Sequence, residues 1–230
     1  MSPAKSSGMI LPLPIWSSAP PQLRLQAGEI HLWRAHLADS TRVEACERTL
    51  SAEERLRAGR FAFAEDRQHF IIAHAALRTV LARYVGGEAA ELEFTTGEFG
   101  KPQVVQLFTD VRFNLSHTDG LALIAVSLGR EVGVDVERVN RDIEYEEIAD
   151  HYFDPREAWD LRIAPPQERA CRFFEVWTRK EACLKASGAG LGGEIEPRWN
   201  VRNLQPAEGY AGALASEGED WRLACWEWSL

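Results

Sequence analysis

The sequence has few cysteines, no long apolar run and no excess of positive charge, and each absence argues against a class of protein. Its four cysteines in 230 residues show no Cys-x-x-Cys spacing and no paired histidines, so neither a zinc site nor a disulfide framework is indicated. No apolar stretch reaches the roughly 18 residues that a membrane-spanning helix needs. The formal net charge of −9 argues against bulk binding to nucleic acid or anionic membranes. We therefore expect a cytoplasmic protein that binds neither nucleic acid nor membrane.

Positive charge is concentrated between Arg55 and Arg83, where six arginines accompany two acidic residues. The fork of donors on arginine matches phosphate oxygens, so this island in an acidic chain suits a phosphorylated ligand. A solvated helix face is the alternative, and we prefer it for Arg78 and Arg83. The candidates for phosphate binding are Arg57, Arg60 and Arg67.

The segment Gly133–Glu137 has the pattern of a strand with two carboxylates on one face and valines on the other. Side chains two apart share a strand face, so Asp135 and Glu137 point the same way. They would lie roughly 7 Å apart along the strand, within reach of one hard cation. The alternative is an edge strand with a charged outer face.

The segment 173–185 has helical periodicity, and one of its faces changes from aromatic to charged. Spacings of three and four residues place Phe174, Trp177, Glu181 and Lys185 on this face. Partial desolvation beside the aromatic rings would raise the pKa of Glu181 toward a value useful for proton transfer. The alternative is an ordinary Glu–Lys pair on a solvated surface.

Two segments upstream carry further polar candidates. Phe113–Thr118 ends a short strand, so we expect Ser116 and His117 at a strand-to-strand connection, where side chains are presented rather than packed. The turn-rich segment Gly97–Pro102 is expected to hold Lys101 out from the body of the protein. Taken alone, a histidine in a loop is more often structural or incidental than functional.

Together these segments resemble the surfactin-type 4′-phosphopantetheinyl transferase family. The strand motif Gly-Val-Asp-Val-Glu is followed by Trp-x-x-Lys-Glu-x-x-x-Lys-x-x-Gly-x-Gly-Leu, here Trp177 to Leu191. Gly-Lys-Pro and Phe-Asn-Leu-Ser-His precede them in the family's order, and the resemblance extends over residues 30–230. It implies Mg²⁺-dependent transfer of the phosphopantetheine arm of coenzyme A to a serine of an apo acyl or peptidyl carrier protein. We expect the enzyme to be a monomer.

The resemblance also implies roles for individual residues. The metal ligands would be Asp135, Glu137 and Glu181. Glu181 would also take the proton of the carrier serine, directly or through water, while Lys185 would stabilise charge on the leaving 3′,5′-bisphosphate. The nucleotide end of coenzyme A would be held by Lys101, Ser116 and His117. The 3′-phosphate would meet Arg57, Arg60 and Arg67, and Lys180 would contact a phosphate or the carrier protein.

At two positions the chain departs from the family pattern. The best-known members have a basic residue three positions before the one that matches Arg57, where this chain has Glu54. They also have an arginine where this chain has His69. Which basic groups hold the 3′-phosphate therefore stays open. Glu54 has a structural reading too, because Ser51 and Glu54 fit a capping box that starts a short helix.

The order of strand and helix patterns indicates an α+β fold. Helices are expected over Asp66–Val85, Ile143–Phe153 and Pro166–Ala186, with another that opens at Asp154–Pro155. Strands are expected over residues 29–37, 93–95, 111–115, 121–127, 132–139, 199–204, 210–215 and 221–228. The proline-rich residues 1–27 are expected to form a loose arm. The resemblance implies two similar subdomains, residues 28–131 and 132–230, packed about a pseudo-twofold axis with the active site between them.

Two alternative functions use the same residues. A metal-dependent pyrophosphatase could hydrolyse coenzyme A with water as the nucleophile, and would release phosphopantetheine without a carrier. A non-catalytic homologue could bind carrier proteins, which the departures at Glu54 and His69 favour. Because the carboxylates and Lys185 are intact, we rank the transferase first.

Overall fold

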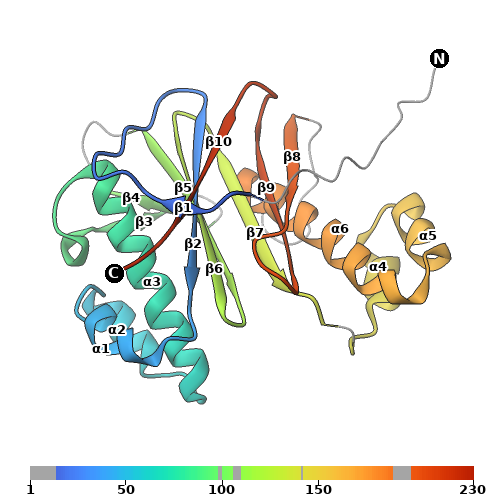
Figure 1. The fold of residues 1–230 in the computed structure, drawn as a ribbon, viewed down its shortest axis with the longest axis horizontal. Coiled ribbons are helices and arrows are strands. Elements are labelled where there is room, and N and C mark those ends of the chain that lie inside the picture. Colours follow the sequence, from blue (N-terminus) through green and yellow to red (C-terminus); the bar gives the residue numbers. More distant parts are fainter. Residues whose placement is uncertain (1–13, 98–99, 106–109, 141, 189–197) are drawn as a thin grey trace.

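Two long helices flank two β-sheets that stand side by side in the computed structural model (Figure 1). The structure describes residues 14–97, 100–105, 110–140, 142–188 and 198–230. Helix α3 (Ala64–Val85) lies beside one sheet and α6 (Pro166–Ser187) beside the other. Each half therefore consists of a sheet and a long helix, which confirms the predicted α+β fold of two similar units.

The first sheet has five strands, and its neighbours run in the order β1, β10, β2, β6, β5. Their bounds are Ser17–Ser18, Arg222–Glu227, Glu29–His36, Leu121–Leu128 and Val111–Thr118. Trp33, Phe113 and Ile124 from this sheet pack with Phe70 and Ile71 of α3 in one buried cluster. The short helices α1 (Val43–Glu47) and α2 (Ala52–Ala58) also contact α3.

The second sheet is antiparallel and has three strands in the order β7 (Val132–Arg138), β9 (Tyr210–Glu217) and β8 (Trp199–Leu204). Ala182 and Ala186 of α6 pack on Ala213 and Ala215 of β9. Helices α4 (Tyr145–Tyr152) and α5 (Pro155–Ile163) pack on the same long helix. The remaining elements are the pair β3 (Phe94–Thr96) and β4 (Pro102–Val104), and the 3₁₀ turns η1 (Ser40–Arg42) and η2 (Ala89–Glu91).

The two sheets meet where β5 lies beside β7, and side chains provide the hydrogen bonds there. The Val134 amide donates to Asn114 Oδ1 at 2.8 Å, and the Val136 amide donates to Ser116 Oγ at 3.3 Å. Asn114 and Ser116 are two residues apart on one face of β5, so they meet alternate amides of β7. This contact brings polar residues of both halves together.

The last strand, β10, follows the boundary predicted after residue 131 but belongs to the first sheet. Strand β10 pairs in parallel with β2, so the chain returns to the first sheet after completing the second.

The arm predicted over residues 1–27 is not loose over its described part. Ser17 and Ser18 pair with β10, Arg34 lies over the Trp16 ring at 4.6 Å, and Arg83 donates to Pro20 O at 2.6 Å. Residues 1–13 lie outside the described part of the chain.

Glu54 contacts both the start of its own helix α2 and side chains of α3, and these contacts include Arg78 of the arginine island. The predicted capping box is present, with Ser51 and Glu54 exchanging both hydrogen bonds at the start of α2. Glu54 also accepts from Arg78 Nε at 2.5 Å and contacts His74 Nδ1 at 2.9 Å. Arg78 is only 2% exposed and donates to Leu92 O, so the solvated position expected for it is wrong. These partners outweigh burial and hold the pKa of Glu54 at about 2.

Candidate active site

A glycine lets α6 approach β7 closely enough to place its charged face beside the carboxylates. A Cβ at Gly133 would lie 2.1 Å from Ala182 O and 2.3 Å from Ala186 N, both backbone atoms of α6. Any side chain there would separate helix and strand. Glu181 and Lys185 flank this contact along α6, so they reach the same part of β7.

Asp135 is the centre of the group. It is 2% exposed, so the alternative of a charged outer strand face does not apply to it. Ser116 Oγ donates to Asp135 Oδ1 at 2.9 Å, and Lys185 Nζ donates to the same oxygen at 2.6 Å. Lys185 Nζ also donates to Ser116 Oγ at 3.0 Å. The other oxygen, Asp135 Oδ2, is buried without a partner among the described residues, which is costly unless a ligand meets it.

Three carboxylates share this region and repel one another. The pKa of Glu137 is raised to about 7, first by burial and then by the charge of Asp135, with a smaller effect of Glu181. Burial and Asp135 also raise the pKa of Glu181, although Lys185 opposes this. A divalent cation would relieve the repulsion and meet the free Asp135 oxygen, so the donor set fits a hard cation. Within the described residues the three do not form a group whose ligand atoms all lie within 4.8 Å. The Lys185 ammonium supplies the positive charge at Asp135 instead.

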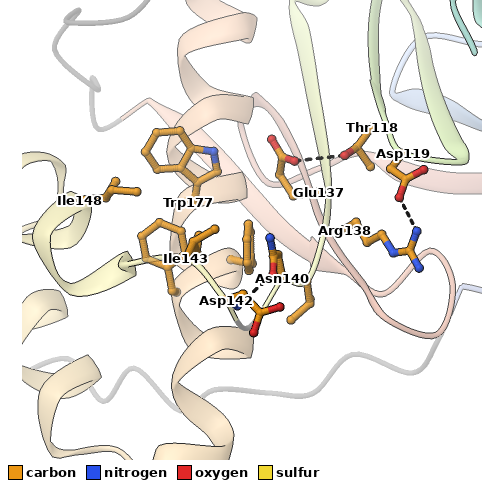
Figure 2. A pocket seen from close by; sticks show the side chains of 12 residues that line it. Thr118, Asp119, Glu137, Arg138, Asn140, Asp142, Ile143, Ile148 and Trp177 are labelled. Carbon is orange, nitrogen blue, oxygen red and sulfur yellow. Dashed lines mark hydrogen bonds and ion pairs between the residues drawn. The ribbon is translucent and has the colours of Figure 1, made fainter. Parts of the chain in front are cut away.

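Of the three carboxylates, Glu137 lines a cleft of about 690 Å³ between the two halves (Figure 2). Thr118 and Glu137 form the polar side, and Thr118 Oγ1 donates to Glu137 Oε2 at 3.3 Å. Ile148 of α4 and Trp177 of α6 contribute to the apolar side. The predicted aromatic-to-charged face of α6 therefore borders the cleft at its aromatic end and contacts Asp135 at its charged end. Such a cleft suits a ligand with an apolar or extended portion and a charged end.

Two of the residues assigned to the nucleotide end lie close to this group. Strand β5 continues to Thr118, so Ser116 and His117 are in a strand and not at a connection, and Ser116 is buried. The extension reflects an unbroken antiparallel pairing of β5 with β6 up to Thr118 and Leu121. His117 is partly exposed, and burial together with His74, Lys185, His69 and Arg57 lowers its pKa to about 4.

The other predicted cations lie apart from the carboxylates. Lys101 is not held out from the body: its Nζ donates to Glu131 Oε2 at 2.6 Å, and to Val132 O and Ala186 O at 3.0 Å. All three ammonium protons therefore have protein partners. Lys180 pairs with Glu157 of α5 at 3.0 Å.

The three arginines chosen as phosphate ligands are exposed on the first half. Arg57 lies over the Phe70 ring at 5.1 Å, close enough to influence His117. Arg67 pairs with Glu47 at 2.7 Å, and Arg60 extends from the end of α2. Arg57 is thus the member of the island that the structure brings nearest to the candidate site.

Sequence reasoning missed Asn114 and Thr118. Asn114, Ser116 and Thr118 alternate along β5, and each makes a polar contact to β7. The signal was the period of two within the motif Phe-Asn-Leu-Ser-His-Thr, which becomes visible once the strand is extended to Thr118. Residues 189–191 at the end of the α6 motif lie outside the described part.

Comparison with known proteins assigns the chain to a family. Residues 32–129 match the family model described as 4′-phosphopantetheinyl transferase, N-terminal, and residues 131–228 match that of the 4′-phosphopantetheinyl transferase superfamily. The chain is 35% identical over 232 residues to the 4′-phosphopantetheinyl transferase HetI of a Nostoc species, covering 93% of this chain and 98% of that protein. The chain belongs to the 4′-phosphopantetheinyl transferase family.

Further relatives have lower coverage. Sfp of Bacillus subtilis is 31% identical over 142 residues, which is 62% of either chain. The 4′-phosphopantetheinyl transferase gsp of Aneurinibacillus migulanus is 30% identical over 145 residues, or 63% of this chain and 58% of that protein. As a 4′-phosphopantetheinyl transferase, the protein is an enzyme of group transfer. None of the helices in the described ranges combines the length and apolar character needed to cross a membrane.

Proposed function

We propose that this transferase moves the 4′-phosphopantetheine arm of coenzyme A to a serine of an apo acyl or peptidyl carrier protein. The reaction requires Mg²⁺ and releases adenosine 3′,5′-bisphosphate. The observation that carries the proposal is the group of three carboxylates beside Lys185, in which one Asp135 oxygen has no partner among the described residues and Glu137 lines the cleft. The monomeric state and the cytoplasmic location stay predictions.

Asp135, Glu137 and Glu181 are the residues that would hold Mg²⁺. When bound, the ion would neutralise the diphosphate of coenzyme A and make its β-phosphorus a better electrophile. The raised pKa of Glu137 supports this assignment. It shows that the carboxylates repel one another when all are ionised, and a bound cation would offset this repulsion.

Glu181 is the proposed base. It takes the proton of the carrier serine hydroxyl, directly or through water, as the serine oxygen attacks the β-phosphorus. A phosphorus–oxygen bond forms to the serine, and the bond to the departing 3′,5′-bisphosphate breaks. Burial raises the pKa of Glu181 toward the pH at which a carboxylate accepts a proton effectively.

Lys185 is the residue proposed to bind a phosphate oxygen of coenzyme A. Its contacts to Ser116 and Asp135 use two of its three N–H donors, so within the described part of the chain one remains for a phosphate oxygen. Lys101 has all three donors engaged, and its proposed contact with the nucleotide would require an exchange of partners. His117 and Arg57 are better placed for the 3′-phosphate, and Arg60, Arg67 and Lys180 remain secondary candidates.

An intact-mass assay tests the proposal. The protein, coenzyme A and an apo carrier protein are incubated with Mg²⁺ or with EDTA, and the mass of the carrier is measured. We expect a gain of one phosphopantetheine only with Mg²⁺, its loss in Asp135→Ala, and normal activity in Glu208→Ala, which changes an exposed carboxylate between β8 and β9. Release of phosphopantetheine without a carrier would instead indicate hydrolysis and contradict the proposal.

A further inference from the structure

A second cavity, of about 440 Å³, adjoins the cleft and shares Thr118, Asp119 and Arg138 with it. Three of its lining side chains are Glu65, His69 and Asp119, and each offers a ligand atom within 4.8 Å of the other two. Zinc-type ions hold nitrogen and oxygen ligands at about 2.0–2.2 Å, so two ligands of one ion lie up to about 4.4 Å apart. Small rotations of the exposed Glu65 and Asp119 side chains close the remaining difference.

Two rigid elements position the three side chains. Glu65 and His69 are four residues apart in the first turns of α3, so they share one helix face. Asp119 begins the turn between β5 and β6. Tyr210 Oη donates to Asp119 O at 2.7 Å. Figure 2 shows that Arg138 donates to Asp119 Oδ2. The backbone of all three residues is thus set by a helix and a hydrogen-bonded turn, while the exposed Glu65 and Asp119 side chains can still rotate toward an ion.

His69 is the observation that points to a ligand. Its side chain is only 7% exposed, yet neither ring nitrogen has a hydrogen-bond or ion-pair partner among the described residues. The ring nitrogens are not among the fully buried atoms that lack a partner, so they open onto the cavity, where a ligand can reach them. Its ring lines the cavity and faces two carboxylates, which is the environment of a metal ligand and not of an apolar core residue.

We propose that Glu65, His69 and Asp119 form a second metal site, which binds a first-row transition cation such as Zn²⁺ or Co²⁺. An imidazole nitrogen favours such ions over Mg²⁺, which prefers oxygen ligands alone. The site uses none of the three carboxylates of the proposed active site. A bound cation would join the start of α3 to the β5–β6 turn, next to His117 and Thr118.

Co²⁺ binding to the full-length, EDTA-treated protein tests the site, with stoichiometry from equilibrium dialysis and coordination from the visible spectrum. The Asp135→Ala background removes the proposed active-site cation and should retain one Co²⁺. In this background, Asp119→Asn and His69→Gln should each weaken binding at least tenfold, as even loss of outer-shell groups does so. Asp66→Asn changes an exposed carboxylate of the same cavity outside the group and should leave affinity unchanged.

The Arg138→Gln variant gives an effect of opposite sign. Removal of a guanidinium that competes for Asp119 should tighten Co²⁺ binding severalfold. No Co²⁺ bound in the Asp135→Ala background would overturn the proposal. So would equal losses in Asp66→Asn and Asp119→Asn, or weaker binding in Arg138→Gln. Because Asp119 is exposed, its variant keeps the test valid even where His69→Gln disturbs folding.

Discussion

The close contact of α6 and β7 at Gly133 makes this glycine a point at which a single methyl group should disturb both stability and catalysis. In Gly133→Ala, the new Cβ would meet Ala182 O at 2.1 Å and Ala186 N at 2.3 Å. Cβ atoms essentially never approach other heavy atoms within 3.0 Å, so α6 would have to retreat by about 1 Å. The obstacles are backbone atoms of a helix, which cannot rotate away as a side chain can.

Two losses should follow. Overpacking of a core contact costs about 1–3 kcal/mol in the free energy of unfolding, and a backbone obstacle favours the upper end. Glu181 and Lys185 would move with α6, and a displacement of about 1 Å in a catalytic group can lower the rate about 10²-fold. Denaturant unfolding measures the first loss, and carrier modification at saturating coenzyme A measures the second.

Gly59→Ala is the matched control, because a Cβ there would lie 3.5 Å from Leu56 O and 3.7 Å from Arg55 O, which are ordinary contacts. Its φ of −67° suits alanine, and we expect a change within about 1 kcal/mol and an unchanged rate. A Gly133→Ala protein as stable and as active as Gly59→Ala would refute the reasoning. It would mean that the position of α6 on β7 does not set the positions of Glu181 and Lys185.

Four further predictions concern single groups. Glu181→Gln should retain coenzyme A binding by calorimetry but lose about 10²–10⁴-fold in kcat, and a normal single-turnover rate would remove it as the base. The pKa of Glu137 is raised from 4.5 to about 7, so without Mg²⁺ the free energy of unfolding should fall as pH rises through this window. Each pKa unit is worth about 1.4 kcal/mol, and urea titrations in EDTA should show a shallower fall for Glu137→Gln. Arg57→Glu should raise the KM for coenzyme A more than that for dephospho-coenzyme A; equal increases would place the 3′-phosphate elsewhere. Glu54→Lys should cost about 3–5 kcal/mol in denaturant unfolding, because Arg78 would keep a buried charge without its partner; unchanged stability with tighter coenzyme A binding would contradict this.

Local sequence signals predicted the elements of the fold well. The capping box of Ser51 with Glu54 is present, and so is the Asp154 cap with proline at the first helical position. The two long helices begin and end within two residues of the predicted bounds. Such features depend on residues close in sequence, which is why they can be read without the tertiary structure.

Errors arose where distant residues decide the outcome. Lys101 follows a turn-rich segment, which suggests exposure, yet its partners lie 30, 31 and 85 residues away. Arg78 reads as a surface residue of a helix, but Glu54 and two carbonyl groups around η2 satisfy it in the interior. A buried cation requires partners, and a sequence does not reveal which distant acceptors will be near.

The residue types of the candidate site could be predicted from the sequence, but the burial and the contacts of those residues could not. Asp135 and Glu137 share a strand face as alternation requires, but that face is buried against β5 and α6. Asn114 and Ser116 supply the acceptors that a neighbouring backbone would supply in a continuous sheet, so their polarity serves the junction of the two halves. Because Ser116 also donates to Asp135, the same hydroxyl joins the sheets and orients a proposed metal ligand. The contact that joins the two halves therefore also positions a carboxylate of the proposed site. This explains why polar residues occupy a strand face that packing alone would have made apolar.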